Sequence, residues 1–431
     1  MILITKYNKQ QWGFLLFIAA INFFKAVVEA MQKPFVHSIG HEQDISLLEW
    51  RVLLSAFDVT VLISGLVLGW VLRERHIHVA VKLSPFIIAN ACIFLAAIDK
   101  LSGARFVAFA SCLRILEGFG KAMFVISSTK VITCFYREIY YIIPVMEVFN
   151  GLGWIFGPFI AQVLYDLIGF AGPFAFVGAL MNLIGVLALL LIDFKAMGAA
   201  LEVPGESYKS MNTTIFKKFL FWVMMFATAI CGAAWSYLVV ELWQNVLSTE
   251  NEITMVFMIG SVACVAVTPI WGHMAWISDH VRPSIVATII ALTGYTLIPL
   301  ASWVMTHGMM MINFSVGVFG IGAAGVSLIP LLYSLEEAGD ARLVTGMWLS
   351  ADAFGTILAA NVGAEFVKYM GFEGGSLIIG MLYIVLVSVL IAVHCKTSNK
   401  MKQIEIVEVP IPIKEIEEEK PKEKEEEDVK V

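Results

Sequence analysis

Residues 151–170 read GLGWIFGPFIAQVLYDLIGF, and residues 354–372 read FGTILAANVGAEFVKYMGF. Gly153 of the first stretch and Gly355 of the second are 202 positions apart, and each precedes a Gly-Phe pair by sixteen residues. Both stretches are apolar enough to form a helix inside a membrane. Their shared spacing indicates that the chain contains a duplicated unit.

Other glycines repeat at almost the same offset. The matched pairs are Gly118 with Gly320, Gly120 with Gly322, and Gly69 with Gly272, at offsets of 202, 202 and 203. A chain with 33 glycines yields single matches by chance, but several matches in register favour a duplication. We therefore expect two similar halves.

The composition excludes a soluble globular protein. Of the 431 residues, 59% are hydrophobic and only 15% are charged, and the mean hydropathy is +0.82. Soluble domains are about half apolar and about a quarter charged. The apolar runs are long and continuous, which excludes a membrane β-barrel with its alternating segments of about ten residues. Twelve helices of about 20 residues would use about 240 residues and leave enough chain for loops.

Apolar runs bounded by charged residues, glycine and proline predict twelve membrane spans. They are 12–31, 50–72, 81–100, 105–135, 141–166 and 171–193 in the first half, and 215–245, 253–276, 284–305, 309–333, 342–367 and 374–395 in the second. The predicted fold is an all-α membrane protein with two six-helix bundles.

Polar segments divide the chain. Residues 1–194 are expected to form the first bundle and residues 219–395 the second, joined by a polar cytoplasmic linker at 195–218. Residues 396–431 are rich in Glu, Lys and Pro and hold 8 Lys against 11 acidic residues. Such a composition cannot bury enough apolar surface to fold, so we expect a disordered acidic tail.

Basic residues indicate the side of the membrane on which each loop lies. With the N-terminus inside, the cytoplasmic loops hold ten Lys or Arg residues and the outer loops five, in agreement with the positive-inside rule. The first apolar run carries two charged residues and no small-residue cleavage site, so it is interpreted as a retained span. Both termini are then cytoplasmic, and the sequence leaves open whether the membrane is vesicular or the plasma membrane.

Several classes of protein are excluded by the motifs that the sequence lacks. It has no P-loop and none of the common hydrolase, metalloprotease or kinase motifs, so we expect neither an enzyme nor an ATP-driven pump. The six cysteines have no metal-ligand spacing, and no domain is basic, so we expect no metal, no cofactor and no nucleic acid. The expected partners are the lipid bilayer, protons and a small-molecule substrate, bound by a monomer.

Span four carries three charged residues on one helix face, because Arg114, Glu117 and Lys121 are spaced i, i+3 and i+7. Charge inside a span is costly and indicates a cavity, unless the three residues form a self-neutralising structural stripe. The stretch from Arg114 to Ala122 resembles the R-x-x-(Q/E)-G-x-G-x-A motif of the drug:proton antiporter group of the major facilitator superfamily. The resemblance implies a role for Arg114 in proton coupling.

Span five contains a small-xxx-small face formed by Gly153 and Gly157, followed by Pro158, which bends the helix. Packing explains these residues, and the same packing would serve a hinge. The stretch resembles the antiporter motif G-x-x-x-G-P-x-x-G-G, with Ala161 and Gln162 in place of its last two glycines.

Glu147 precedes this motif and the residues LYDLIGF at 164–170 follow it, and both features are similar to the vesicular amine and polyamine transporter branch. An ionised carboxylate that faces lipid is strongly disfavoured. We therefore expect Glu147 to face the cavity, where Arg114 or Lys121 could approach it. It could bind the proton, bind a cation or serve as a structural partner of Arg114.

The loop after span two departs from the superfamily. The signature G-x-x-x-D-R-x-G-R begins at Gly69, but Arg73 stands where the acid is expected. The second copy begins at Gly272 and keeps an acid–base pair in Asp279 and Arg282. In the superfamily such groups latch the cytoplasmic ends of the bundles, so we expect a rearranged latch or an ordinary solvated loop.

Further ionisable residues lie inside other spans. Lys25 and Glu29 are spaced i, i+4 on span one, so they are able to pair. Asp58 and Glu241 lack a local partner and are candidates for a cavity or proton site.

Asp352 lies four residues from Trp348 on span eleven. Its carboxylate and the aromatic face of Trp348 could meet one cationic ligand. Trp348 could equally be a packing residue.

The predicted function is secondary active transport, by proton-coupled antiport of organic cations such as amines or polyamines. Coupling requires a carboxylate for which proton and cation compete, and the candidates are Glu29, Asp58, Glu147 and Glu241. Two alternatives stay open. Arg114 and Lys121 together could form the anion site of an organic-anion carrier, and the altered loop and acidic tail would fit a receptor or scaffold that does not transport.

Overall fold

The computed structural model describes residues 7–32, 45–194, 213–238, 250–303, 308–338 and 340–407. Within these ranges the protein is helical and contains no β-strand. The first half holds α1 (Lys9–Ala30), α3 (Leu47–Val71), α4 (Glu74–Ala97), α5 (Gly103–Phe135), α6 (Ile139–Ile168) and α7 (Ala171–Leu191). The second half holds the short 3-10 helix η1 (Thr213–Lys217), α9 (Phe219–Tyr237), α11 (Glu250–Ile277), α12 (Val281–Trp303), α13 (Gly308–Ala338), α14 (Ala341–Leu358), the π-helical stretch η3 (Ala359–Gly363) and α15 (Ala364–Val407).

Eleven of the twelve long helices in the described part of the chain are long and apolar enough to cross a membrane. The exception is α5, whose middle carries Arg114, Glu117 and Lys121. Its 33 residues are nevertheless ample for a span. The prediction of an all-α membrane protein with twelve long helices is therefore confirmed.

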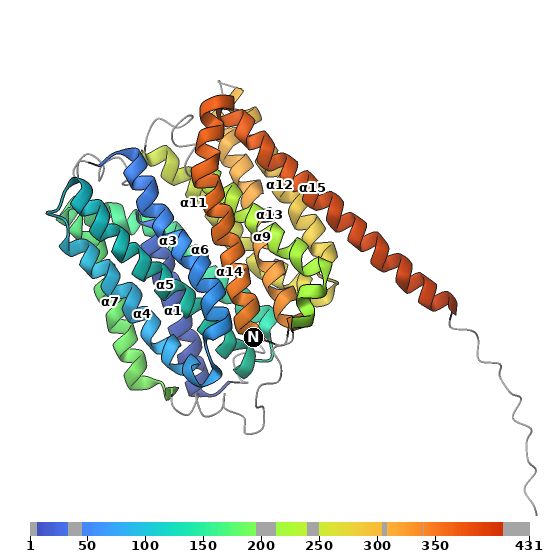
Figure 1. Ribbon diagram of the computed structural model, residues 1–431, viewed down its shortest axis with the longest axis horizontal. Helices are drawn as coiled ribbons and strands as arrows, with labels where there is room; N and C mark the ends of the chain where they lie inside the picture. Colours follow the sequence, from blue (N-terminus) through green and yellow to red (C-terminus); the bar gives the residue numbers. More distant parts are fainter. Residues whose placement is uncertain are drawn as a thin grey trace, which may run out of the picture.

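The two halves form two bundles that lie side by side, the first (blue to green) on the left of Figure 1 and the second (yellow-green to red) on the right. Within the first bundle α1 packs against α6, α3 against α5, and α4 against α5 and α7. The second bundle repeats these contacts, as α9 packs against α14, α11 against α13, and α12 against α13 and α15. Between the bundles, α3 packs against α14 and α6 against α11.

Matched glycines make matched contacts in the two bundles. Gly118 of α5 lies against the backbone oxygen of Phe57 on α3, and Gly320 of α13 lies against that of Gly260 on α11. A side-chain carbon at either glycine would collide with the neighbouring backbone. Only glycine lets these helices approach so closely, and the duplication that the glycine spacing predicted is present in the fold.

The two Gly-Phe pairs that end the repeated stretches also match. Gly169 has φ +79° and Gly371 has φ +74°, a left-handed conformation that residues other than glycine rarely adopt. Gly169 ends α6 before the turn into α7, and Gly371 interrupts the helical conformation within α15. Gly371 thus divides α15 at the place where Gly169 separates α6 from α7 in the first repeat.

One end of the two bundles is called here the linker end. Helices α3 and α7 end there, at Val71 and Leu191, and helices α6 and α9 begin there. Helix α15 continues past this end to Val407, into the segment 396–431 where we expected a disordered tail. It runs away from the bundles at the lower right of Figure 1. Residues 195–212 of the expected linker and 408–431 of the expected tail lie outside the described residues.

Candidate functional site

Two buried ion pairs occupy the interior of the first bundle. Lys121 Nζ of α5 lies 2.7 Å from Glu29 Oε2 of α1, and both side chains are largely buried. Two turns earlier on α5, Arg114 Nη1 lies 2.5 Å from Glu117 Oε2, with only 4% of either side chain exposed. The second pair joins neighbours on one helix, whereas the first ties the fourth span to the first.

The ring of Phe57 on α3 covers both cations. The Arg114 guanidinium lies 4.3 Å and the Lys121 ammonium 5.1 Å from its centroid. Such cation–π contacts strengthen when water is excluded, and Phe57 is 4% exposed. The close approach of α3 that brings this ring over α5 is the one that Gly118 permits.

Glu147 of α6 lies at the edge of this group. Its Oε2 accepts a hydrogen bond of 3.2 Å from the amide of Asn150. The buried Lys25 of α1 interacts electrostatically with Glu147, Glu29 and Lys121, which joins α1, α5 and α6 in one charge network. Glu147 also interacts with Cys264 of α11, so it faces the second bundle.

Two pairings that the sequence suggested, Lys25 with Glu29 and Arg114 with Glu147, are not the close ion pairs observed. Glu29 forms its close ion pair with Lys121 and not with Lys25, because the helix packing brings α5 to α1. Arg114 forms its ion pair with Glu117, the neighbour that the i, i+3 spacing offered, and not with Glu147. Helix spacing suggests partners only on the same helix, whereas Lys121, the partner of Glu29, lies 92 positions away.

In the described part of the second bundle, apolar residues replace the charged residues of α5. At 202 positions beyond Arg114, Glu117 and Lys121 it carries Val316, Phe319 and Ala323, all buried and apolar. One acid, Asp352, stands at the equivalent of Asn150. It lies beside Gly232 of α9 and interacts electrostatically with Lys121, as does Asp58 of α3. A carboxylate of the second bundle thus takes part in the charge network of the first.

Trp348 does not offer its polar edge to a ligand. Its indole nitrogen donates a hydrogen bond of 2.9 Å to the backbone oxygen of Ser327, and the residue is 9% exposed. This arrangement agrees with a packing residue. Glu241, another candidate, lies outside the described residues.

The glycines of span five bring α6 against α1. A side-chain carbon at Gly153 would meet the backbone oxygen of Phe23, and one at Gly157 would lie 2.8 Å from Ala30 Cβ. Pro158 lies inside the continuous helix α6. In the second bundle Gly355 brings α14 against α9 in the same manner, through the backbone of Ala229.

Backbone contacts close the linker end between the bundles. Gly69 of α3 lies against the backbone of Arg342 on α14, and Gly272 of α11 lies against Tyr140 and Pro144 of α6. Arg342 also donates a hydrogen bond of 2.7 Å from Nη1 to the backbone oxygen of Leu72.

Arg342 is held by Asp340, through Nη2 to Oδ2 at 2.8 Å and Nε to Oδ1 at 3.0 Å. Burial acts to raise the pKa of Asp340, but the hydrogen bonds and charge of Arg342 outweigh it and hold the pKa below its usual value. Asp279, the acid of the second loop copy, instead pairs with Arg282 and His394 of its own bundle, each at 3.6 Å. Among the described residues it makes no ion pair with the first bundle.

A second polar group at the linker end was not foreseen from the sequence. It contains Tyr140 of the first bundle with His280 and Glu336 of the second. These residues match no motif. The repeat offset alone could have indicated Tyr140, since it is the counterpart of Arg342 at 202 positions.

The model of the Major Facilitator Superfamily matches residues 16–340, three quarters of the chain. This chain belongs to the major facilitator superfamily. The superfamily consists of transporters and not of enzymes, as the missing catalytic motifs led us to expect. Within the described residues no group of three His, Cys, Asp or Glu side chains could hold a metal ion.

Individual relatives agree with the resemblance stated from the motifs. The human synaptic vesicular amine transporter is 24% identical over 308 residues, which cover 69% of this chain and 58% of that protein. The chain thus spans less than two thirds of the amine transporters. The mouse MFS-type transporter SLC18B1 is 21% identical over 397 residues, 87% of this chain and 84% of the relative. The crystal structure of the human organic anion transporter MFSD10 (TETRAN) superposes with a TM-score of 0.63, covering 89% of this chain at 14% identity, which shows the shared fold.

Proposed function

We propose that this major facilitator transporter exchanges protons for organic cations such as amines or polyamines. The observation that carries the proposal is a network of charged side chains that joins the two bundles. Within the described residues the network contains three cations, Lys25, Arg114 and Lys121, and the acids Glu29, Asp58, Glu117, Glu147 and Asp352.

An ionised carboxylate inside a membrane protein is costly, and either a proton or a cationic ligand can neutralise it. A proton and an organic cation that neutralise the same carboxylates exclude each other. Each then leaves when the other binds, which is the requirement for exchange. The amine transporters among the relatives support the same class of substrate.

Glu147 and Asp352 are the acids best placed for this competition. Glu147 faces α11 through Cys264, and Asp352 of α14 interacts with Lys121 of α5, so both lie where the bundles meet. Substrates of transporters with repeated bundles bind near the midplane at this interface. We infer in addition that the linker end and both termini face the cytoplasm, and that one chain forms the complete transporter.

An organic-anion carrier is the competing function. Arg114 and Lys121 would form its anion site, but Glu117 and Glu29 already pair with them at 2.5 and 2.7 Å. An anion would have to displace buried carboxylates from both cations. The observed pairing favours the cation.

Purified protein in proteoliposomes tests the proposal. Vesicles with an acidic lumen are given a labelled monoamine, a labelled polyamine or a labelled organic anion. We expect accumulation of at least one cation that collapses when a protonophore removes the pH gradient. Accumulation of the anion alone would establish the competing function, and no accumulation of any compound by correctly inserted protein would favour a receptor or scaffold.

A further inference from the structure

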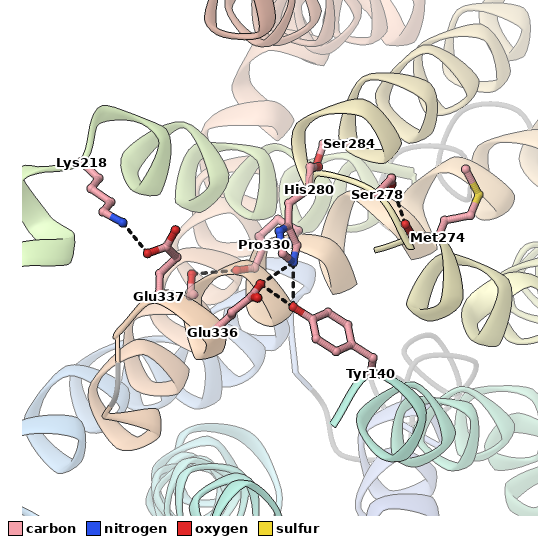
Figure 2. Close-up of polar contacts among 10 residues, drawn as sticks. Tyr140, Lys218, Met274, Ser278, His280, Ser284, Pro330, Glu336 and Glu337 are labelled. Carbon is pink, nitrogen blue, oxygen red and sulfur yellow. Dashed lines mark hydrogen bonds and ion pairs between the residues drawn. The ribbon is translucent and has the colours of Figure 1, made fainter. Parts of the chain in front are cut away.

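Tyr140, His280 and Glu336 form a compact triangle between the bundles at the linker end (Figure 2). The Tyr140 hydroxyl of α6 donates to Glu336 Oε2 of α13 at 2.5 Å and lies 3.1 Å from Nε2 of His280. The same nitrogen lies 3.4 Å from Glu336 Oε2. The first bundle thus supplies one member of the triangle and the second bundle supplies two.

The triangle closes the linker end, next to the contact between Gly272 and Tyr140. Gly272 packs against the backbone of Tyr140, so the hydroxyl reaches His280 only while α6 and α11 are in contact. A transporter that works by alternating access must separate the bundles at this end once in each cycle. The Tyr140 hydrogen bonds must then break.

We propose that Tyr140, His280 and Glu336 form a proton-sensitive latch, which opens when His280 takes up a proton from the solution at the linker end. This proton site is separate from the charge network inside the first bundle. The proposal requires alternating access, and it does not depend on which substrate is carried.

The direction of the effect follows from which residues move together. His280 and Glu336 belong to the same bundle, so their attraction persists when the bundles separate. Only Tyr140 moves away, and it no longer shields His280 from water. A protonated His280 also competes with Tyr140 for the Glu336 carboxylate. Both effects favour separation of the bundles when the imidazole is charged.

The electrostatic surroundings agree with this direction. Burial lowers the pKa of His280 in the closed form, and this outweighs the opposing effect of the nearby acids. The closed form therefore binds fewer protons than a form with His280 in water, so acidification favours the open form. The groups that face His280 are Tyr140 of α6, Tyr333, Glu336 and Glu337 of α13, and Asp279 beside it in the chain.

Two of these acids have other partners. Lys218 forms an ion pair with Glu337 (Figure 2), and Arg282 and His394 pair with Asp279. Glu336 is thus the acid most available to a charged His280.

Distances between spin labels test the latch in the full chain in lipid nanodiscs. One label is attached at Arg75→Cys in the first bundle and one at Lys217→Cys in the second, both exposed at the linker end, after serine has replaced the exposed native cysteines. We expect the population with the longer distance to rise about threefold between about pH 7.5 and about pH 5.5, the range in which histidine titrates. An unchanged distribution in the labelled protein would overturn the proposal.

Four variants identify the group that responds. His280→Phe keeps an aromatic ring against Tyr333 and should abolish the pH response, with His280→Gln as the second variant if the first does not fold. Tyr140→Phe should show the longer distance at both pH values. His394→Gln is the matched control and should behave like the unsubstituted protein, since His394 contacts its own bundle. A pH response that survives in both His280 variants, or a closed Tyr140→Phe protein, would refute the latch.

Discussion

Arg342 and Tyr140 are structural equivalents 202 positions apart, and each places its backbone against a glycine of the opposite bundle. Arg342 faces Gly69 and Tyr140 faces Gly272. The duplication therefore extends beyond the separate bundles to the way in which they meet. The two contacts are not equally tight. A side-chain carbon would lie 3.3 Å from the Arg342 oxygen at Gly69, but 2.7 Å from the Tyr140 oxygen at Gly272.

This difference predicts unequal effects of one methyl group. Gly272→Ala should force α6 and α11 apart and destabilise the closed form by about 1–3 kcal/mol, the usual cost of overpacking. Gly69→Ala should cost less, because its neighbour has to yield by only a few tenths of an ångström. Thermal unfolding of the detergent-purified variants, together with thiol labelling at the linker end, measures both effects. Equal shifts for the two variants would contradict the difference in packing.

Because Lys121 and Glu29 form a buried ion pair, we expect the loss of stability on replacing one of them to depend strongly on whether the other is present. Lys121→Met alone leaves a buried carboxylate without its close partner, and Glu29→Leu alone strands the ammonium. Each should destabilise the protein by about 3–5 kcal/mol, whereas the double variant should recover most of that loss. Thermal unfolding of all three proteins gives the coupling energy.

The comparison variant is Lys368→Met, which removes a cation whose 3.9 Å ion pair with Glu365 is exposed to solvent. Its effect should stay below about 1 kcal/mol. Additive losses at Lys121 and Glu29 would show that the two side chains do not interact in the membrane.

The twelve helices and the duplication could be predicted from the sequence because both produce a regular pattern of residues. Apolar runs of span length report burial in lipid, and glycines recur wherever two backbones touch. The same reasoning could place Arg114, Glu117 and Lys121 on one face of α5. It could not pair Lys121 with Glu29, because helix spacing relates only residues of one helix.

The partner of each side chain was the least predictable feature. Trp348 gave the same sequence signal for a ligand site and for packing, and only its hydrogen bond to Ser327 favours packing. Tyr140, His280 and Glu336 come from three separate segments and share no spacing. Their proximity is a consequence of the contact between α6 and α11.

The orientation of the bundles is open to a direct test. If the linker end faces the cytoplasm, a protease restricted to that side should cut within residues 195–218 in sealed vesicles. The same protease restricted to the other side should leave these residues intact. A glycan on Asn212 of the native protein would instead place the linker outside, and it would reverse the side from which His280 takes its proton.

We expect substitution of Glu147 to have the largest effect on the coupling of transport to the pH gradient. Glu147→Gln keeps the size of the side chain and its contact with Asn150 but removes its charge and its titration. If proton and cation compete for this carboxylate, the variant should lose at least about tenfold in uptake driven by a pH gradient, equivalent to about 1.4 kcal/mol. Uptake into proteoliposomes, with the amount of inserted protein measured in parallel, gives the comparison.

Glu365→Gln is the matched control, because it makes the same substitution at an exposed carboxylate on α15 and should transport normally. A Glu147→Gln protein that still concentrates substrate would move the coupling site to Asp58 or Asp352. Degradation of the variant would indicate a structural role, since Lys25 would lose a nearby countercharge. In that case Lys25→Met should restore the folded Glu147→Gln protein, because removing both charges costs less than leaving one of them buried alone.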